Sequence, residues 1–159
     1  MAASPERKVK RSTAVAPPGQ PPRVQVGALC WRRTGKGVRV MLITSRDTGR
    51  WIIPKGWLMR NRTEAEAAAR EAWEEAGLRG DILDRSIGVY TYRKVLGPGR
   101  AISCVVRVYP LEVREMLKQY PETGQRSGKW FALEKAARRV VEPELKRLIR
   151  SFDPNAAAA

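Results

Sequence analysis

The segment from Gly56 to Leu78 constrains this 159-residue chain more than any other part of it. Thr63, followed three residues later by Glu66, forms the pattern of a capping box and predicts a helix that begins near Glu64. Gly77 stands where a helix-ending glycine is expected. Apolar residues recur between these ends at helical spacing and predict one buried face: Ala65, Ala68, Ala69, Ala72, Trp73 and Ala76.

The opposite side of this helix is predicted to be acidic. Arg70, Glu71, Glu74 and Glu75 fall together there, and like charges three or four residues apart weaken a helix by roughly 0.2–0.5 kcal/mol per pair. A few carboxylates together with substrate phosphates are the usual environment of Mg²⁺. Ala67 lies near the same face and leaves room beside the acids. From the residues alone, both a magnesium site and a solvated acidic stripe stay open.

The flanking residues resemble the Nudix box, G-x5-E-x7-R-E-U-x-E-E-x-G-U with U an aliphatic residue, which is the signature of the Nudix hydrolases. Ala72 is a small apolar residue at the first U position, whereas Arg62 stands where the family has its first glutamate. We therefore expect Glu64 or Glu66 to brace the box arginine instead. The positions that match the signature are Gly56, Arg70, Glu71, Glu74, Glu75, Gly77 and Leu78.

This resemblance implies an α+β fold, the Nudix-type α/β/α sandwich with a mixed β-sheet, and cleavage of a phosphoanhydride bond by water. It also implies that Mg²⁺, or Mn²⁺ in its place, is held by the carbonyl of Gly56 and by Glu71, Glu74 and Glu75. One of these glutamates, or one from a later loop such as Glu122, would be the general base. The resemblance gives Arg70 a structural role in holding the loop.

Positive charge sets the expectation for the substrate. The chain has 31 Lys and Arg against 16 Asp and Glu, a formal net charge of +15. Clusters of Arg and Lys bind phosphates through charge-assisted hydrogen bonds, so a phosphate-rich small molecule fits better than a nucleoside diphosphate sugar. The residues expected to bind substrate are Arg46, Arg50, Lys55, Arg62, Arg93 and Arg126.

Two further segments narrow the substrate class. Residues 51–56 and 128–136 look like parts of Nudix enzymes that act on diphosphoinositol polyphosphates and diadenosine polyphosphates. Both substrates stay open, because the aromatic residues that could stack on a base are more often core residues. Those residues are Trp51, Trp57, Tyr90, Tyr92 and Trp130.

We expect the chain to consist of three parts. Residues 1–23 are basic and proline-rich and are expected to be disordered, residues 24–152 to form the Nudix hydrolase domain, and residues 153–159 to be a loose end. Besides the box helix, we expect strands at residues 24–32, 38–45, 51–53, 82–96, 101–111 and 129–131. Further helices are expected at residues 133–138 and 143–152.

Composition excludes several other classes of protein. Without histidine, the chain cannot use imidazole-bound zinc, a histidine base or a Ser-His-Asp triad. Cys30 and Cys104 are far apart in apolar segments and are expected to be buried thiols. No apolar run is long enough to span a bilayer, and the amino terminus lacks the apolar core of a secretory signal, so we expect a cytoplasmic protein without a membrane partner.

A second function stays open beside the small-molecule hydrolase. A strongly basic protein attracts RNA or DNA through counterion release, although the chain shows no recognised nucleic-acid-binding signature. The alternative is therefore a basic Nudix protein that interacts with nucleic acid, either as a 5′-end RNA pyrophosphohydrolase or as a non-catalytic binder. The sequence gives no expectation for the oligomeric state.

Overall fold

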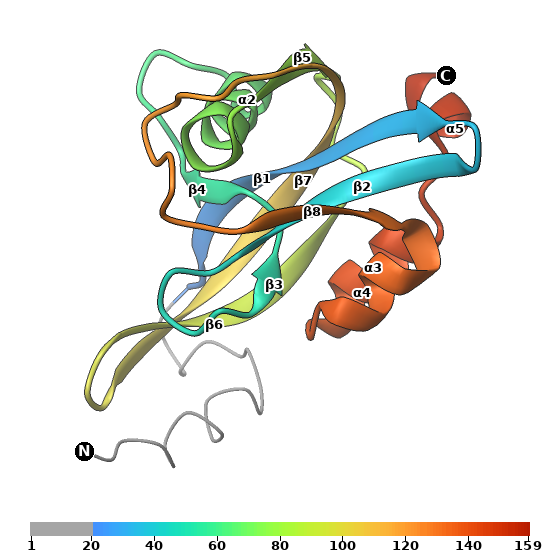
Figure 1. Ribbon diagram of the computed structural model, residues 1–159. Coiled ribbons are helices and arrows are strands. Elements are labelled where there is room, and N and C mark those ends of the chain that lie inside the picture. The colour runs from blue at the N-terminus through green and yellow to red at the C-terminus, as the bar shows by residue number, and fades with distance from the viewer. Residues whose placement is uncertain (1–20) are drawn as a thin grey trace.

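The computed structural model describes residues 21–159, and nearly all of the expected tail, residues 1–23, lies outside them (Figure 1). The strands are β1 (Arg23–Thr34), β2 (Gly37–Thr44), β3 (Trp51–Ile52), β4 (Lys55–Trp57), β5 (Leu78–Ile82), β6 (Gly88–Gly97), β7 (Arg100–Met116) and β8 (Gly128–Ala132). The helices are α2 (Glu64–Ala76), α3 (Leu133–Arg139), α4 (Pro143–Arg150) and α5 (Pro154–Ala158). Within residues 21–159, no helix has the length and apolar character needed to cross a membrane.

The eight strands form one mixed sheet. Strands β1 and β7 run parallel, with Arg23 opposite Cys104 and Trp31 opposite Glu112, and every other pairing is antiparallel. The long strand β1 pairs with two different strands along one of its edges. Its first residues pair with β4, and its last residues pair with β2. Because β4 pairs with the first residues of β1, Gly56 on β4 lies below α2 (Figure 1).

Helix α2 covers one face of the sheet, and α3 and α4 cover the other (Figure 1). Along β1, Val26 and Ala28 pack in the core beneath α2, whereas Leu29 packs in the core beneath α3 and α4. Both faces of this strand are buried, which explains its nearly continuous apolar sequence. The expected α+β fold, an α/β/α sandwich with a mixed sheet, is confirmed.

Both ends of α2 are where the sequence places them. The backbone N–H of Glu66 donates to Thr63 Oγ1 over 3.1 Å, and the backbone N–H of Thr63 donates to Glu66 Oε1 over 2.8 Å, which completes the capping box. Gly77 ends the helix in the left-handed conformation, at φ +69°. The N–H of Gly77 donates to the carbonyl of Trp73 over 3.0 Å.

The two sides of α2 differ from the expectation at several residues. Glu71 and Glu75, expected on the side opposite the apolar face, are instead buried together with the alanines. Ala67, expected to leave room beside the acids, is fully buried in the core between the helix and the sheet. Trp73 is only partly buried, and the guanidinium groups of Arg70 and Arg79 lie 4.8 and 5.5 Å from its ring centroid. The physical reason is size, because alanines let the helix approach the sheet closely while an indole ring does not fit into that narrow space.

The expectation of a loose end at residues 153–159 is wrong, because this segment contains α5. Asp153 caps the helix by accepting a hydrogen bond from the N–H of Asn155 over 2.9 Å, and Pro154 occupies its first turn. Arg33 Nη2 donates to Asn155 Oδ1 over 2.9 Å, and Ala157 packs against the core beneath α3 and α4. These tertiary contacts hold a run of alanines that the sequence alone leaves unanchored.

The two cysteines are buried free thiols, as expected. Burial raises the pKa of Cys30 to about 12, so this thiol stays protonated and unreactive at neutral pH.

Replacing Gly77 with alanine is expected to destabilise the protein. The left-handed conformation is less favourable by about 1–2 kcal/mol for a residue with a Cβ. The added Cβ would also meet the ring of Tyr120. The free energy of unfolding, measured by urea denaturation, should fall by at least this amount. Gly35→Ala is the control, because a Cβ there meets nothing within 4 Å. Equal stability of the two variants would contradict the role of Gly77.

Candidate active site

Two of the three box glutamates lie together on the sheet side of α2. Glu71 and Glu75 are one helical turn apart, and each is only 8% exposed. Each carboxyl group lies within range of the charge of the other. The backbone N–H of Lys55 donates to Glu75 Oε1 over 3.3 Å, which joins the carboxylate pair to the start of β4.

Gly56 is required where β4 meets these acids. A Cβ on this residue would occupy the position of the Glu71 carboxylate. Only glycine therefore allows the β4 backbone to come this close to the acid. The sequence signature predicts a glycine here, and the structure supplies the steric reason for it.

Burial gives the pair unusual protonation behaviour. Burial, with the neighbouring charges of Glu75 and Glu74, raises the pKa of Glu71 to about 8. Burial also raises the pKa of Glu75, while Arg126 and Lys55 act in the opposite direction. Two carboxylates in contact are unfavourable when both are ionised, and a cation beside them removes that repulsion.

The residues present fit a hard divalent cation. The nearby donor atoms are carboxylate and backbone oxygens, which Mg²⁺ and Mn²⁺ prefer. Glu74, the third expected ligand, points away in the structure, and its Oε2 lies 2.7 Å from Arg70 Nε. Within residues 21–159, no three Asp, Glu, Cys or His side chains surround one point. The assignment of Glu71, Glu74, Glu75 and the Gly56 carbonyl as metal ligands stays a prediction.

Arg70 is not braced as expected. Glu64 instead pairs with Arg107 and accepts a hydrogen bond from the Tyr109 hydroxyl over 2.8 Å. Glu66 is occupied by the capping box. Arg70 therefore pairs with Glu74 on its own helix, an arrangement that the i, i+4 spacing permits.

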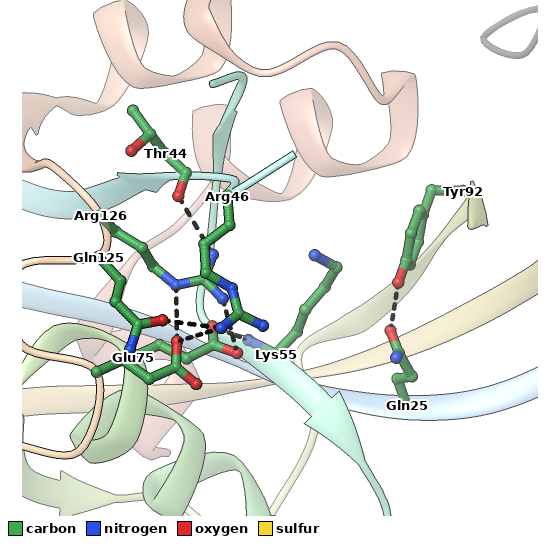
Figure 2. Close-up of polar contacts among 9 residues, drawn as sticks. Gln25, Thr44, Arg46, Lys55, Glu75, Tyr92, Gln125 and Arg126 are labelled. Atoms are coloured by element: carbon green, nitrogen blue, oxygen red, sulfur yellow. Dashed lines mark hydrogen bonds and ion pairs between the residues drawn. The ribbon is translucent and has the colours of Figure 1, made fainter. Parts of the chain in front are cut away.

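Arg126 lies in the centre of a buried ion-pair cluster (Figure 2). Its Nη2 lies 3.5 Å from Glu75 Oε2, its Nε lies 3.1 Å from Glu122 Oε1, and its Nη1 donates to the carbonyl of Thr44 over 3.2 Å. Only 8% of its side chain is exposed. We expected Arg126 to bind substrate, but in the structure it instead links α2 to the loop before β8.

The loop that contains Glu122 is also attached to α2 directly. The backbone N–H of Glu122 donates to the carbonyl of Glu74 over 3.0 Å. Arg46 approaches Glu122 from outside, at 4.0 Å, and donates to Gln125 Oε1 over 2.8 Å. The structure thus brings Glu122 next to the box acids, which is compatible with a catalytic role for it.

Lys55 lies between the carboxylate pair and β6. Its Nζ is 4.9 Å from the centroid of the Tyr92 ring, whose hydroxyl donates to Gln25 Oε1 over 2.7 Å (Figure 2). Burial lowers the pKa of Lys55 to about 8, against the opposing influence of Glu75 and Glu142. Lys55 is therefore a cation whose backbone contacts a box acid and whose ammonium group lies beside β6.

The other expected substrate-binding arginines lie farther out or are already paired. Arg50 Nη1 is 3.4 Å from Glu142 Oε2. Arg62 is exposed in the loop before α2, and Arg93 is half-buried on β6 opposite Ser103. Within residues 21–159, neither Arg62 nor Arg93 forms an ion pair. Substrate binding by these residues stays a prediction.

Sequence reasoning missed two buried polar residues of this region. Gln25 is 3% exposed and Glu142 is 7% exposed. Each residue has a recognisable sequence context. Gln25 is a polar residue in an apolar strand, and Glu142 directly precedes Pro143 at the start of a helix. Neither signal reveals burial, because burial depends on what packs against each residue.

An α/β/α sandwich with two buried carboxylates on a capped helix and a glycine loop against them is compatible with a phosphohydrolase. Residues 21–152 match the NUDIX domain family, and the chain belongs to it. Members of this family are hydrolases of pyrophosphate bonds and generally use a divalent metal ion.

The chain is similar to several named proteins of this family. It is 34% identical over 123 residues to Nudix hydrolase 16, mitochondrial, from Arabidopsis thaliana, covering 75% of this chain and 68% of that protein. It is 31% identical over 114 residues to diphosphoinositol polyphosphate phosphohydrolase 3-alpha from Homo sapiens, covering 70% and 65%. The chain spans 68%, 52% and 58% of the length of Nudix hydrolases 16, 13 and 12 from Arabidopsis thaliana.

The fold is also that of a solved structure, a binary complex of the C. elegans Ap4A hydrolase. The TM-score is 0.62 at 23% identity, over 86% of this chain and 99% of that one. At this identity the likeness establishes the fold alone.

Gly56→Ala is expected to weaken divalent-cation binding. The added Cβ would displace the Glu71 carboxylate, and disturbing groups that orient metal ligands typically lowers metal affinity by about 10- to 100-fold. Mn²⁺ titration followed by electron paramagnetic resonance measures the affinity directly. Gly35→Ala is the control, because a Cβ there meets nothing within 4 Å. Unchanged Mn²⁺ affinity in the Gly56 variant would argue against a metal at this loop.

Removing Arg126 is expected to cost much stability. Arg126→Ala leaves the buried Glu75 without its partner, and breaking a buried ion pair destabilises a protein by about 3–5 kcal/mol. Arg46→Ala is the matched control, since Arg46 approaches the same Glu122 but is 54% exposed, and exposed pairs contribute about 0–1 kcal/mol. Thermal and urea unfolding compare the two. Similar losses would show that burial is not what makes Arg126 important.

Proposed function

We propose that this chain is a metal-dependent pyrophosphohydrolase that cleaves a phosphoanhydride bond in a phosphate-rich small molecule by attack of water. The observation that carries the proposal is the buried pair of Glu71 and Glu75 against the Gly56 loop, with cations grouped around it. A buried pair of acids weakens a fold unless it holds something positive. A substrate with many phosphates suits both the bound cation and the surrounding arginines.

Mg²⁺, with Mn²⁺ as the alternative, is the ion we propose for this site, held by Glu71, Glu75 and the Gly56 carbonyl. Glu74 would join them after leaving Arg70. When bound, such an ion neutralises phosphate charge and lowers the pKa of its bound water. The ion is proposed on the oxygen chemistry of these groups and on their fit to a hard cation.

The protein side chains orient the carboxylates and provide positive charge for the phosphates. Arg126 holds the second oxygen of Glu75, which keeps the first oxygen turned toward the β4 backbone. Lys55 and the exposed Arg46 attract the phosphate chain to the carboxylates. The general base is one of the box glutamates or Glu122, which the loop before β8 brings beside them.

Relatives support a phosphate-rich substrate. One is a diphosphoinositol polyphosphate phosphohydrolase, and a structural neighbour is an Ap4A hydrolase. Both compounds carry a phosphoanhydride within a strongly anionic molecule, which matches the formal net charge of +15. We propose these two classes ahead of RNA, since the cations discussed above cluster around the carboxylates.

The test is a Mg²⁺-dependent phosphate-release screen with purified protein. The substrates are a diphosphoinositol polyphosphate, diadenosine penta- and hexaphosphate, ADP-ribose, nucleoside triphosphates, and triphosphorylated and capped RNA. Glu75→Gln should lower kcat by roughly 100-fold or more, whereas Glu115→Gln, an exposed glutamate on β7, should not. Cleavage of ADP-ribose alone or of RNA alone would contradict the substrate class. Full activity in Glu75→Gln would contradict the site.

A further inference from the structure

The side chains of β6 alternate between the two faces of the sheet. Tyr90 and Tyr92 belong to the core beneath α3 and α4, and so does Cys104, which lies opposite Tyr92 on β7. Because successive side chains of a strand point to opposite faces, Lys94 is on the same face as Tyr92, two residues earlier. Ile102, which lies opposite Lys94 on β7, packs against this same core. Lys94 thus shares its face of the sheet with Tyr92.

Arg93, the neighbour of Lys94 on β6, lies on the other face. It is opposite Ser103 on β7. Arg107, four residues further along β7, is on the same face as Ser103 and pairs with Glu64 of α2. Two adjacent cations of one strand therefore meet different surroundings, although the sequence indicated Arg93 as the one that binds substrate.

Lys55 connects the face of Lys94 to the box acids. Its backbone N–H donates to Glu75 Oε1 over 3.3 Å, and its Nζ lies 4.9 Å from the centroid of the Tyr92 ring. Figure 2 shows the Lys55 side chain between Glu75 and the hydrogen-bonded pair of Tyr92 and Gln25. Lys94 follows roughly 7 Å further along β6, at two residues of strand rise. The box acids, Lys55 and Lys94 therefore follow one another from α2 across to β6.

Lys94 is not engaged by an acid. It is half-buried and forms no ion pair within residues 21–159. The sequence has no Asp or Glu between Ile87 and Leu111, so the hairpin of β6 and β7 supplies no acid of its own at this end. Two ammonium groups on one face of the sheet, Lys55 and Lys94, are suited to an anion that contacts both.

We propose that Lys94, together with Lys55, forms a second anion subsite that binds a phosphate of the substrate remote from the bond that is cleaved. This inference rests on the function proposed above. The cleaved bond lies at the box acids, and Lys94 meets the substrate beyond Lys55. An ammonium group binds phosphate as a compact charge with three donors, so it accepts phosphates of different orientation. Arg93, on the other face, takes no part.

Steady-state kinetics on the compound that the wild-type protein cleaves fastest test the subsite. Lys94→Ala should raise KM about 10-fold, the size of effect given by one hydrogen bond to a charged group. It should leave kcat nearly unchanged, because the interaction is the same in the ground state and the transition state. Lys94→Arg keeps the positive charge and should largely restore KM.

Inhibition by linear inorganic polyphosphates of increasing length tests the position of the subsite. The inhibition constant of the wild-type protein should fall once the chain is long enough to extend from the box acids to Lys94. Lys94→Ala should lose this step and should keep the wild-type response to pyrophosphate.

Arg93→Ala is the matched control, because it removes the same charge from the adjacent position of the same strand but on the other face. It should leave KM and the inhibition series unchanged. A cation on an edge strand also prevents pairing between molecules, and β6 pairs with β7 alone among the described strands. Both residues share this role and the general attraction of anions, so only a subsite separates the two variants. Thermal melting checks that each variant folds.

The outcomes separate the inference from the function beneath it. Equal changes of KM in Lys94→Ala and Arg93→Ala, or no change in either, overturn the subsite while the hydrolase proposal stands. A loss confined to kcat also overturns it, because it would place Lys94 at the reacting phosphate. Folded wild-type protein that cleaves none of the screened compounds with Mg²⁺ overturns the proposed function, and the subsite with it.

Discussion

The contact between the Glu71–Glu75 pair and the start of β4 is the constraint on which the site depends. It needs a helix whose packing face is made of alanines, so that α2 lies close to the sheet. It also needs glycine at position 56, where the Glu71 carboxylate fills the space of a side chain. Finally, it needs a β4 strand that pairs with the first residues of β1 and so lies under the helix. A change in any of these elements would move the acids relative to the loop.

Two buried acids of this region, Glu75 and Glu142, each pair with an arginine from a distant part of the chain. Arg126 pairs with Glu75 and also with Glu122, four residues before it, and Arg50 pairs with Glu142. The desolvation of a carboxylate is unfavourable, and each such pair offsets part of that cost with an opposite charge. The cations are abundant and the acids are few, so the positions of the acids determine which arginines remain available to phosphate.

Much of the site helix could be predicted because its determinants are local. Thr63, Glu66 and Gly77 act on backbone groups within one turn, and their spacing defines both ends of α2. The parallel pairing of β1 with β7 could not be predicted in this way, because no local pattern encodes contact across some 80 residues. For the same reason the sequence shows Arg126 as a surface cation, whereas the fold encloses it between α2 and the loop before β8.

Net charge is therefore an incomplete guide to substrate. Of the cations near the box, Arg126 and Arg50 are engaged by acids, and Arg46 approaches Glu122. The arginines that form no ion pair within residues 21–159 are others, such as Arg62 in the loop before α2 and Arg93 on β6. The total of Lys and Arg side chains therefore overstates the positive charge that a phosphate group would meet beside the carboxylates.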